Sequence, residues 1–312
     1  MKNDFISVVL CSHNPRIAYL QRVMAALQEQ TLPPSSWELL IVDNRSDQPL
    51  ATQVELSWHG DARCVREENL GLSHARCRGI RESKGEVIVF VDDDNVLAPD
   101  YLEQAMQISR QQPKAGVWCG QSKAEFETSP ADWAKPFLPY LALREFGEDT
   151  FMMKRDMSQP LPYGAGMCVR RVVAEAFAQA YQQESWRSLL GRQGSNLMSG
   201  EDSDMALLSL KLGWGIGSFS RLRLLHLIPS SRLTREYLLR LTEASSASSC
   251  LISCFHSEEP QAPSRLRLAF RYLRYWLIPG GMQRSFMLSV IAGEWRACGI
   301  LSQLGFRGMP SI

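Results

Sequence analysis

The fold is decided by residues 87–94, whose sequence VIVFVDDD joins five apolar residues to three carboxylates. Most of the apolar residues are β-branched, and Lys84-Gly85 stands just before them. An uninterrupted apolar run of this length, bounded by polar residues, predicts a strand buried on both faces of a parallel sheet. The three adjacent acids at its carboxyl end, Asp92 to Asp94, repel one another and lower stability unless their charge is compensated.

Two interpretations of this acidic triplet follow from its chemistry. Hard oxygen ligands suit Mg²⁺ or Mn²⁺, and Mg²⁺ is often shared between one or two carboxylates and the phosphates of a substrate. Alternatively, the triplet is a solvated acidic turn that begins the next helix, with Asp94 or Asn95 as the N-cap. The triplet alone leaves both interpretations open.

The first half of the chain alternates β-rich segments with segments whose apolar residues have helical spacing. Such alternation predicts a parallel α/β sheet with right-handed crossovers and helices on its faces. Strands are expected at residues 5–12, 37–43, 62–65, 87–91 and 115–120, and helices at residues 17–30, 72–83 and 99–112.

Polar side chains follow several of these expected strands. Ser12 and Asn14 come after the first, Asp43 after the second, and the acidic triplet after the strand at residues 87–91. In open α/β sheets, ligands bind outside the carboxyl ends of the strands. We therefore expect these side chains to line one edge of the sheet and to form the binding site.

The regular alternation stops between residues 124 and 162, which are rich in proline and aromatic residues. This segment is either a long excursion that shapes a pocket or a peripheral structural insertion. Two glycines in residues 163–167 (YGAGM) then allow the backbone to turn sharply or to approach a ligand closely.

A second acidic cluster, residues 201–204 (EDSD), begins a helix that is expected to end at Gly213. Acids at a helix start commonly interact with the helix dipole, which explains Asp204 well. It explains less well why three acids follow the loop at residues 194–200. Trp214, just after this helix, is either a platform on which a ligand stacks or a core aromatic.

Beyond Pro229 the sequence becomes basic and amphipathic, notably at residues 232–240 and 265–274. We therefore expect two regions: a catalytic domain at residues 1–228, and a helical C-terminal extension at residues 229–312. Arginines interspersed with Trp and Tyr fit a helix that lies on an anionic membrane surface. They also fit a helix packed on the catalytic domain with its arginines in solvent.

The composition narrows the class of protein. With 312 residues, 45% hydrophobic and 21% charged, the chain is an ordinary well-cored protein, and its net charge of +1 gives no support for nucleic-acid binding. The eight cysteines form no CxxC pair, which favours reduced thiols in the cytoplasm. The N-terminal apolar run is too short for a signal peptide, and no stretch is long enough to span a bilayer.

With these residues in view, roughly the first 230 residues resemble a family 2 glycosyltransferase of the GT-A fold. That fold is a mixed, mostly parallel sheet flanked by helices. The resemblance rests on motifs in the family's order, each weak alone: residues 8–15 (VVLCSHNP), 40–46 (LIVDNRS), 68–79 (ENLGLSHARCRG), 92–94 (DDD), 163–167 (YGAGM) and 200–204 (GEDSD).

The resemblance implies a site for a nucleotide-sugar. Asp43 resembles the acid that accepts a hydrogen bond from the base, usually uracil. Arg76 resembles a residue near the nucleotide, where a guanidinium suits a phosphate or a base carbonyl. Asn69 is expected to stabilise its loop instead of binding a ligand. The residues expected at the nucleotide-sugar are Ser12, Asn14, Asp43, Arg76, Asp92 and Asp93.

The resemblance also implies a bound Mn²⁺ or Mg²⁺. Asp92 and Asp94 match the two acids of the DxD motif, and alternate residues of an extended segment face the same way. Asp94 would bind the metal, while Asp92 would face the ribose or a metal-bound water and so belong to the same centre. His226 falls where related enzymes sometimes supply a third ligand, although a lone histidine on an apolar strand is also a common core residue.

Asp202, preceded by Glu201, matches the general base of the family. An acceptor hydroxyl is a poor nucleophile, and an aligned carboxylate removes its proton as the new bond forms. A single displacement with one base inverts the anomeric centre, as in inverting glycoside hydrolysis. The expected catalytic residues are Asp202 and Glu201.

The resemblance thus implies an inverting glycosyltransferase that uses a nucleotide-sugar, UDP-linked by preference, and a saccharide or lipid-linked acceptor. It would act in surface polysaccharide or glycan biosynthesis, in the cytoplasm or peripherally at the inner face of the cell membrane. One alternative is a catalytically inactive GT-A-like binding or scaffold subunit. Another is a nucleotidyltransferase, which normally needs a Gly-rich phosphate loop where this chain has Ser12-His13-Asn14-Pro15-Arg16.

Overall fold

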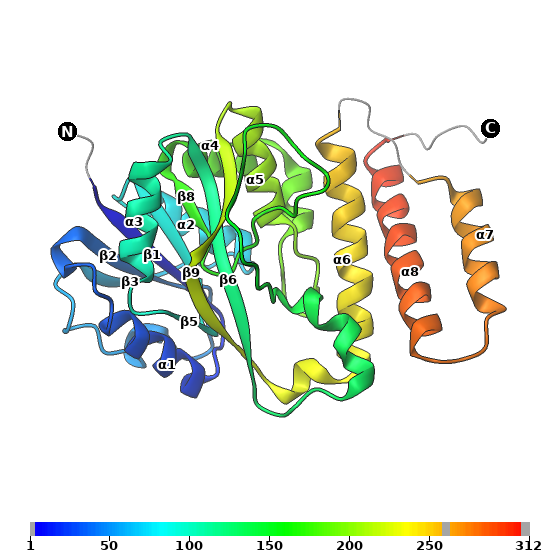
Figure 1. The fold of residues 1–312 in the computed structure, drawn as a ribbon, viewed down its shortest axis with the longest axis horizontal. Helices are drawn as coiled ribbons and strands as arrows, with labels where there is room; N and C mark the ends of the chain where they lie inside the picture. Colours follow the sequence, from blue (N-terminus) through cyan, green and yellow to red (C-terminus); the bar gives the residue numbers. More distant parts are fainter. Residues whose placement is uncertain (1–3, 258–262, 307–312) are drawn as a thin grey trace. The chain divides into compact units, whose positions relative to one another are not determined.

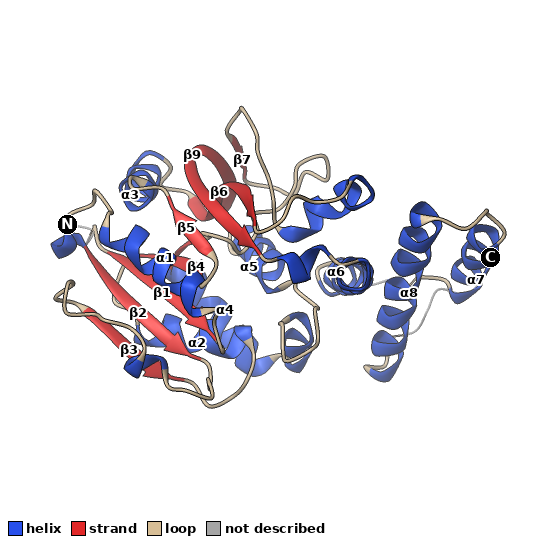
Figure 2. Cartoon of the chain, turned by 90° about the horizontal axis from the view of Figure 1, so that it is seen from below, coloured by secondary structure: helices blue, strands red, loops and turns tan. Residues whose placement is uncertain are grey.

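The apolar run that precedes the acidic triplet forms strand β4 (Val87–Asp92), which is buried from Val87 to Val91 in the computed structural model. Strand β1 (Ile6–Ser12), buried throughout, lies parallel to it. Strand β2 (Trp37–Asp43) pairs in parallel with β1, and β3 (Ala62–Arg66) pairs in parallel with β2. Figure 2 shows β1, β2 and β3 side by side. The structure describes residues 4–257 and 263–306.

The other half of the sheet contains antiparallel strands. The short strand β8 (Cys168–Arg170) lies antiparallel between β4 and β6 (Ala115–Phe126). Strand β9 (Gly215–Ile228) runs parallel to β6, whereas β5 (Asn95–Leu97) and β7 (Thr150–Met152) are antiparallel to β9. The strand order is β3-β2-β1-β4-β8-β6-β9-β5, with β7 also on β9 (Figure 1). This mixed, mostly parallel sheet is the one predicted.

Helices cover both faces of the sheet because successive strand residues point to opposite sides. Val8 and Leu10 of β1 share a core with one pair of helices, and Val9 and Cys11 share a second core with another group. The first pair is α1 (Ile17–Gln28) and α3 (Tyr101–Gln111). The second group is α2 (Leu72–Glu82), α4 (Arg171–Gln183) and α5 (Glu201–Lys211).

The turn after β4 does not begin a helix. Residues 93 and 94 form a turn between β4 and β5, and Asn95 is the first residue of β5. The next helix, α3, has Asp100 as its N-cap. The interpretation of Asp94 or Asn95 as a helix cap is therefore wrong, because a short strand pairs with β9 before the helix starts.

The aromatic segment at residues 124–162 has more structure than its sequence suggested. Strand β6 extends to Phe126, and β7 lies within the segment. An amphipathic 3-10 helix, η3 (Asp132–Leu141), contains Pro136 and Pro139. The other 3-10 helices are η1 (Pro34–Ser36), η2 (Leu50–Thr52), η4 (Ser185–Leu190) and η5 (Ser230–Leu233).

The chain divides into two units. The first contains the sheet and comprises the described residues up to 127 together with 142–188 and 201–228. The second comprises residues 128–141, 189–200 and the described residues from 229 onward. The division at residues 228 and 229 coincides with the expected boundary, but the second unit also recruits two earlier segments.

The second unit is helical. Its helices are α6 (Arg235–Phe255), α7 (Arg265–Trp276) and α8 (Met282–Gln303), and Figure 1 shows α8 between α6 and α7. Gly293 of α8 allows a close approach to α6, since a Cβ there would lie 2.2 Å from the carbonyl oxygen of Glu243. Among the described helices, none is long and apolar enough to pass through a lipid bilayer.

All eight cysteines lie in the described part of the chain, and all are free thiols. Several of them are buried in the core. Burial raises the pKa of Cys11 and of Cys77 to about 12. Because the thiolate is the reactive form, these thiols are chemically inert near neutral pH and serve as small core residues.

Candidate active site

The residues predicted for the site meet at the carboxyl edge of the parallel strands. Ser12 of β1 is level with Asp43 of β2, and Cys11 of β1 is level with Asp92 of β4. The hydroxyl of Ser12 donates a hydrogen bond to Asp93. The parallel register thus gathers these polar groups at one edge, as the strand pattern predicted.

Two of the three predicted metal ligands approach each other. Of the three candidates Asp94, Asp92 and His226, these two are Asp94 and His226: His226 Nε2 lies 3.4 Å from Asp94 Oδ2, and Asn95 Nδ2 donates to Asp94 Oδ1 at 2.9 Å. The β5–β9 pairing causes this, because it sets His226 opposite Asn95. Within residues 4–257 and 263–306, no group of three or more His, Cys, Asp or Glu side chains is arranged to hold a metal ion. Asp94 and His226 bring together one carboxylate and one imidazole, and a divalent cation at this place stays a prediction.

Arg76 is the centre of a buried charge cluster. Its side chain is 2% exposed, and Nη1 lies 3.2 Å from Glu201 Oε1 while Nη2 lies 3.5 Å from Asp92 Oδ1. The guanidinium carbon also lies 5.2 Å from the centre of the Phe90 ring. Burial alone would lower the pKa of Arg76, but the nearby carboxylates of Glu201 and Asp92 raise it overall, so the guanidinium stays charged. Arg76 therefore links the end of β4 to the start of α5. This structural role was not predicted, because only a contact with the nucleotide was expected of Arg76.

The structure separates the two acids that were expected to be catalytic. Glu201 is buried and paired with Arg76, whereas Asp202 is partly exposed. The backbone N–H of Gly164 donates to Asp202 Oδ2 at 2.9 Å. Asp202 is therefore fixed in place by the loop before β8 but stays accessible. A role for Asp202 as the general base, with Glu201 beside it, stays a prediction.

The glycines of residues 163–167 are required by close contacts. A Cβ on Gly164 would lie 2.8 Å from a guanidinium nitrogen of Arg76. Gly166 has φ +67, and its carbonyl oxygen accepts a hydrogen bond from the Tyr101 hydroxyl at 2.7 Å. A left-handed backbone of this kind favours glycine. These glycines thus allow close contacts with Arg76 and Tyr101, whereas their predicted approach to a ligand stays a prediction.

Asp204, the third acid of the second cluster, is not a simple dipole partner. It is buried and forms an ion pair with Arg187, which is also buried. Arg187 lies in η4, which comes before α5 in the chain. No motif in the sequence indicated this ion pair. The only local signal was that three acids follow the loop at residues 194–200.

Asp43 is fully engaged inside the protein. Its Oδ1 accepts the N–H of Ser46 at 2.8 Å, and its Oδ2 accepts the N–H of Leu50 at 3.2 Å and Nη1 of Arg66 at 2.8 Å. Burial raises the pKa of Asp43, but the hydrogen bonds from Ser46 and Leu50 and the charge of Arg66 lower it overall. Both carboxylate oxygens thus shape the loop after β2 in this structure. A contact between Asp43 and a base stays a prediction.

This arrangement makes Asp43 a stability determinant. We expect Asp43→Asn to reduce the free energy of unfolding by about 1–3 kcal/mol, because the charge opposite Arg66 and one hydrogen-bond acceptor are lost. The pKa of Asp43 is lower in the folded chain, so its contribution is present above the unfolded pKa and is lost as the pH falls through the folded pKa. Denaturant titrations at several pH values should show the parent and variant converging in acid. Equal stability at neutral pH would contradict this role.

Two asparagines hold the loops around this edge. Asn14 adopts φ 49, and its side chain exchanges hydrogen bonds with Asp47, which ties the loop after β1 to the loop after β2. Asn44 Oδ1 accepts the N–H of Gly71 at 2.7 Å, and its Nδ2 donates to the carbonyl of Asn69 at 2.8 Å. Asn69 donates to Glu67, as expected for a loop-stabilising residue.

Trp214 lies away from this edge. It stands just before Gly215, which is level with Ala115 at the amino ends of β9 and β6. It packs on the core beneath α4 and α5, with Arg170 5.4 Å from its ring centre. Of its two proposed roles, the core aromatic is the one that the structure supports.

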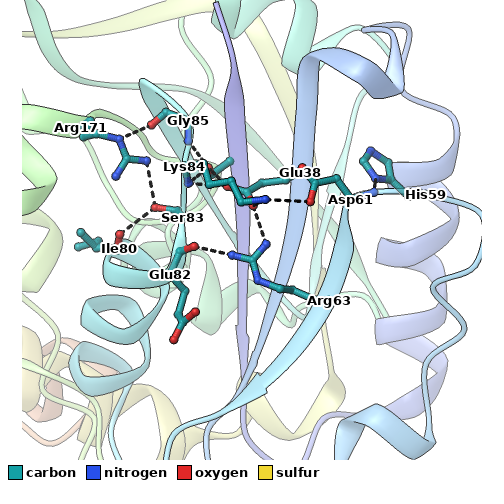
Figure 3. A network of polar contacts seen from close by, with 11 residues as sticks. Glu38, His59, Asp61, Arg63, Ile80, Glu82, Ser83, Lys84, Gly85 and Arg171 are labelled. Atoms are coloured by element: carbon teal, nitrogen blue, oxygen red, sulfur yellow. Dashed lines mark hydrogen bonds and ion pairs between the residues drawn. The ribbon is translucent and has the colours of Figure 1, made fainter. Parts of the chain in front are cut away.

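The amino edge of the sheet carries a separate polar network (Figure 3). Glu38 is fully buried, and it accepts hydrogen bonds from the Ser7 hydroxyl at 2.6 Å and from Arg63 Nη1 at 2.7 Å. Lys84 donates its backbone N–H to Glu38 at 2.5 Å and pairs through Nζ with Asp61 at 3.2 Å. The network ties β1, β2 and β3 to the start of β4, and its polar groups satisfy one another.

A pocket of about 480 Å³ lies among β5, β6, β9 and the end of α1. Its walls include Leu97, Pro99 and Leu224, with Lys123 and Arg223 among its charged residues. None of the residues predicted for catalysis, nucleotide binding or metal binding lines it, so the reaction is not placed there.

Comparisons with known proteins agree with this geometry. An uncharacterized glycosyltransferase of Haemophilus influenzae is 31% identical over 121 residues, 38% of this chain and 40% of that protein. An N-acetylglucosaminyltransferase of Rhizobium meliloti is 23% identical over 218 residues, 67% of this chain and 48% of that protein. The aligned region thus spans less than half the length of each relative.

A solved structure shares the fold. The crystal structure of S. aureus TarS 1-349 in complex with UDP-GlcNAc matches with a TM-score of 0.52 and 13% identity, covering 98% of this chain and 92% of that chain. This likeness confirms the GT-A arrangement of the sheet.

The family is established by its sequence model. A model described as "Glycosyl transferase family 2" matches residues 7–176, which include β1, β2, the acidic triplet and the loop before β8. Because the match covers more than half of the chain, the protein belongs to glycosyl transferase family 2.

Proposed function

We propose that the protein transfers a sugar from a UDP-sugar to a saccharide or lipid-linked saccharide, with inversion at the anomeric carbon. The observation that carries this proposal is the position of Asp202, a partly exposed carboxylate that Gly164 fixes at the start of α5. Glu201, its neighbour, is joined through Arg76 to Asp92. The proposed base is thus linked to the acids that would face the donor.

The mechanism follows from this arrangement. Asp202 removes the proton from the acceptor hydroxyl as the hydroxyl oxygen attacks the anomeric carbon. The new glycosidic C–O bond forms while the bond from the anomeric carbon to the diphosphate breaks, and the electron pair leaves with the diphosphate. One displacement of this kind inverts the anomeric centre. Arg76 offsets the negative charges of Asp92 and Glu201, and its two ion pairs hold these side chains close to the start of α5, where Asp202 lies.

A divalent cation, Mn²⁺ or Mg²⁺, belongs to this proposal. Asp94 and His226 would hold it, because their donor atoms already converge from the turn before β5 and from β9, and Asp92 would lie nearby. When bound, the cation would offset the charge that develops on the departing diphosphate. Ser12 would act indirectly, since its hydroxyl holds Asp93.

Two relatives support the choice of donor. TarS was crystallised with UDP-GlcNAc, and the Rhizobium meliloti protein is named as an N-acetylglucosaminyltransferase. UDP-GlcNAc is therefore the first donor to test. We further propose that the enzyme acts in surface polysaccharide or glycan biosynthesis, in the cytoplasm at the inner face of the cell membrane.

Donor binding tests this proposal directly. We expect UDP-GlcNAc with Mn²⁺ to raise the melting temperature, since a ligand at 100 times its Kd stabilises the native state by about 2.7 kcal/mol. Slow release of UDP without an acceptor would distinguish an enzyme from an inactive binding subunit. Absence of both effects with UDP-GlcNAc and with other UDP-sugars would contradict the proposal.

Asp94→Ala tests the metal site separately. The variant is expected to lose the Mn²⁺-dependent part of the melting shift, because a principal ligand is removed. Asp132→Asn, an exposed acid paired with Lys135, is the matched control and should keep the full shift. An undiminished Mn²⁺-dependent shift in Asp94→Ala would show that this carboxylate does not hold the metal.

A further inference from the structure

Helix α7 exposes an unusual amount of apolar surface. Leu266 and Phe270 are each 70% exposed, Leu273 is 56% exposed and Leu277 is 69% exposed. Leu277 is the C-cap of α7 and keeps a helical backbone. Large apolar side chains scattered singly on a surface are normal, but four on one short helix require an explanation.

These four residues form one stripe along the helix. Their spacing is i, i+4, i+7 and i+11, which at about 100° per residue puts them on a single narrow face. The opposite face carries Leu268 and Tyr275, which pack with Ile291 and Cys298 of α8. Packing within the unit therefore fixes the orientation of α7 and leaves the stripe of Leu266, Phe270, Leu273 and Leu277 pointing away from α8.

Basic residues border the stripe. Helix α7 contains four arginines and no acidic residue. Arg271 is paired with Glu294 of α8 at 2.5 Å, whereas Arg267 and Arg274, next to the stripe on the helix surface, are exposed. Tyr272 and Trp276 flank it on the other side, each about half exposed.

We propose that this face of α7 docks the protein on a membrane surface that contains anionic lipids. An apolar stripe with arginines at one border and Trp and Tyr at the other is the pattern of a helix lying in the lipid interface. The apolar side chains would enter the acyl boundary while the arginines meet lipid phosphates. The inference deepens the membrane location included in the proposed function, but the chemistry of α7 carries it independently of the reaction.

Charge favours lipid over a protein partner. A protein partner would have to place acidic groups at fixed positions opposite Arg267 and Arg274. An anionic lipid surface provides phosphates along the whole helix, and each basic residue near it contributes about 1 kcal/mol, or roughly fivefold in binding. The attraction should weaken as salt is added.

The test is sedimentation of the full chain with vesicles. We expect binding to vesicles of phosphatidylcholine mixed with phosphatidylglycerol and little binding to phosphatidylcholine alone. Phe270→Ser/Leu273→Ser should weaken binding at least about tenfold, since apolar burial supplies part of the energy. Arg267→Gln/Arg274→Gln should weaken it by a similar factor at low salt and less at high salt.

Met157→Ser is the matched control, because Met157 is an apolar residue of the first unit that is 80% exposed. It should bind vesicles like the parent. Unchanged binding of both double variants would overturn the proposal, as would a parent that ignores the vesicles or uses the stripe to self-associate. All variants should retain release of UDP from UDP-GlcNAc, so loss of lipid binding and failure of the proposed reaction are read separately.

Discussion

Asp202→Asn is expected to slow sugar transfer by about 10²–10⁴-fold while leaving the fold intact. The amide oxygen of Asn can still accept the N–H of Gly164, so the side chain should keep its place at the start of α5. What the variant loses is the ability to take a proton from the acceptor hydroxyl. The loss should therefore fall on kcat, with donor binding little changed.

Two measurements separate this role from a structural one. Rates of transfer with UDP-GlcNAc and an acceptor saccharide give the change in kcat, and melting temperatures with and without donor show whether the site still forms. Asp132→Asn should behave like the parent in both, since it is exposed and belongs to the second unit. Full turnover by Asp202→Asn would mean that another group is the base.

Arg76→Met is expected to give the largest loss of stability, about 3–5 kcal/mol. Removing the guanidinium leaves the buried carboxylate of Glu201 without its opposite charge and also removes the positive charge beside Asp92. Met fills a similar volume, so the loss of stability would come mainly from the missing charge and less from altered packing. Denaturant unfolding of the parent and the variant measures the change directly.

The helix that contains Arg76 supplies a matched control. Arg78 lies on the same helix and forms a partly exposed i, i+4 pair with Glu82 at 2.8 Å. Arg78→Met should cost about 0.3–0.5 kcal/mol, as is usual for such pairs. The double variant Arg76→Met/Glu201→Gln should lose less than the sum of the single changes, because each removes the charge that the other needs. Strict additivity would show that the two side chains do not interact.

Much of the sheet could be predicted from sequence because the signals are local. Residues 37–43 and 87–91 are continuous apolar runs, and their neighbours alternate with helices in the order of a parallel sheet. The carboxyl-edge location of Asp43 and Asp92 follows from that order alone. These predictions needed only periodicity and the topology rules of α/β sheets.

The contributions of the later strands could not be predicted in the same way. Strand β8 is three residues long, and its antiparallel pairing with β4 and β6 joins segments far apart in sequence. Such short pairings are fixed by tertiary packing and carry no periodic signal. The placement of residues 128–141 and 189–200 in the second unit also depends on tertiary packing, so it could not be predicted from local sequence either.

The roles of single side chains were the hardest to predict. A motif shows that Arg76 matters, but only the structure shows that it is buried between two carboxylates. Asp43 likewise matches a nucleotide-binding position, yet Ser46, Leu50 and Arg66 occupy its oxygens. Burial and partners depend on distant parts of the chain, so residue type and spacing alone do not determine them.

The cluster around Arg76 also has a consequence for folding. Its ion pair with Glu201 joins residues 125 positions apart, so the site can exist only after most of the first unit has come together. Local opening that separates α5 from α2 would dismantle the charge cluster at once. Activity should therefore be lost in step with cooperative unfolding of this unit, and amide protons near Arg76 should exchange with solvent among the slowest in the chain.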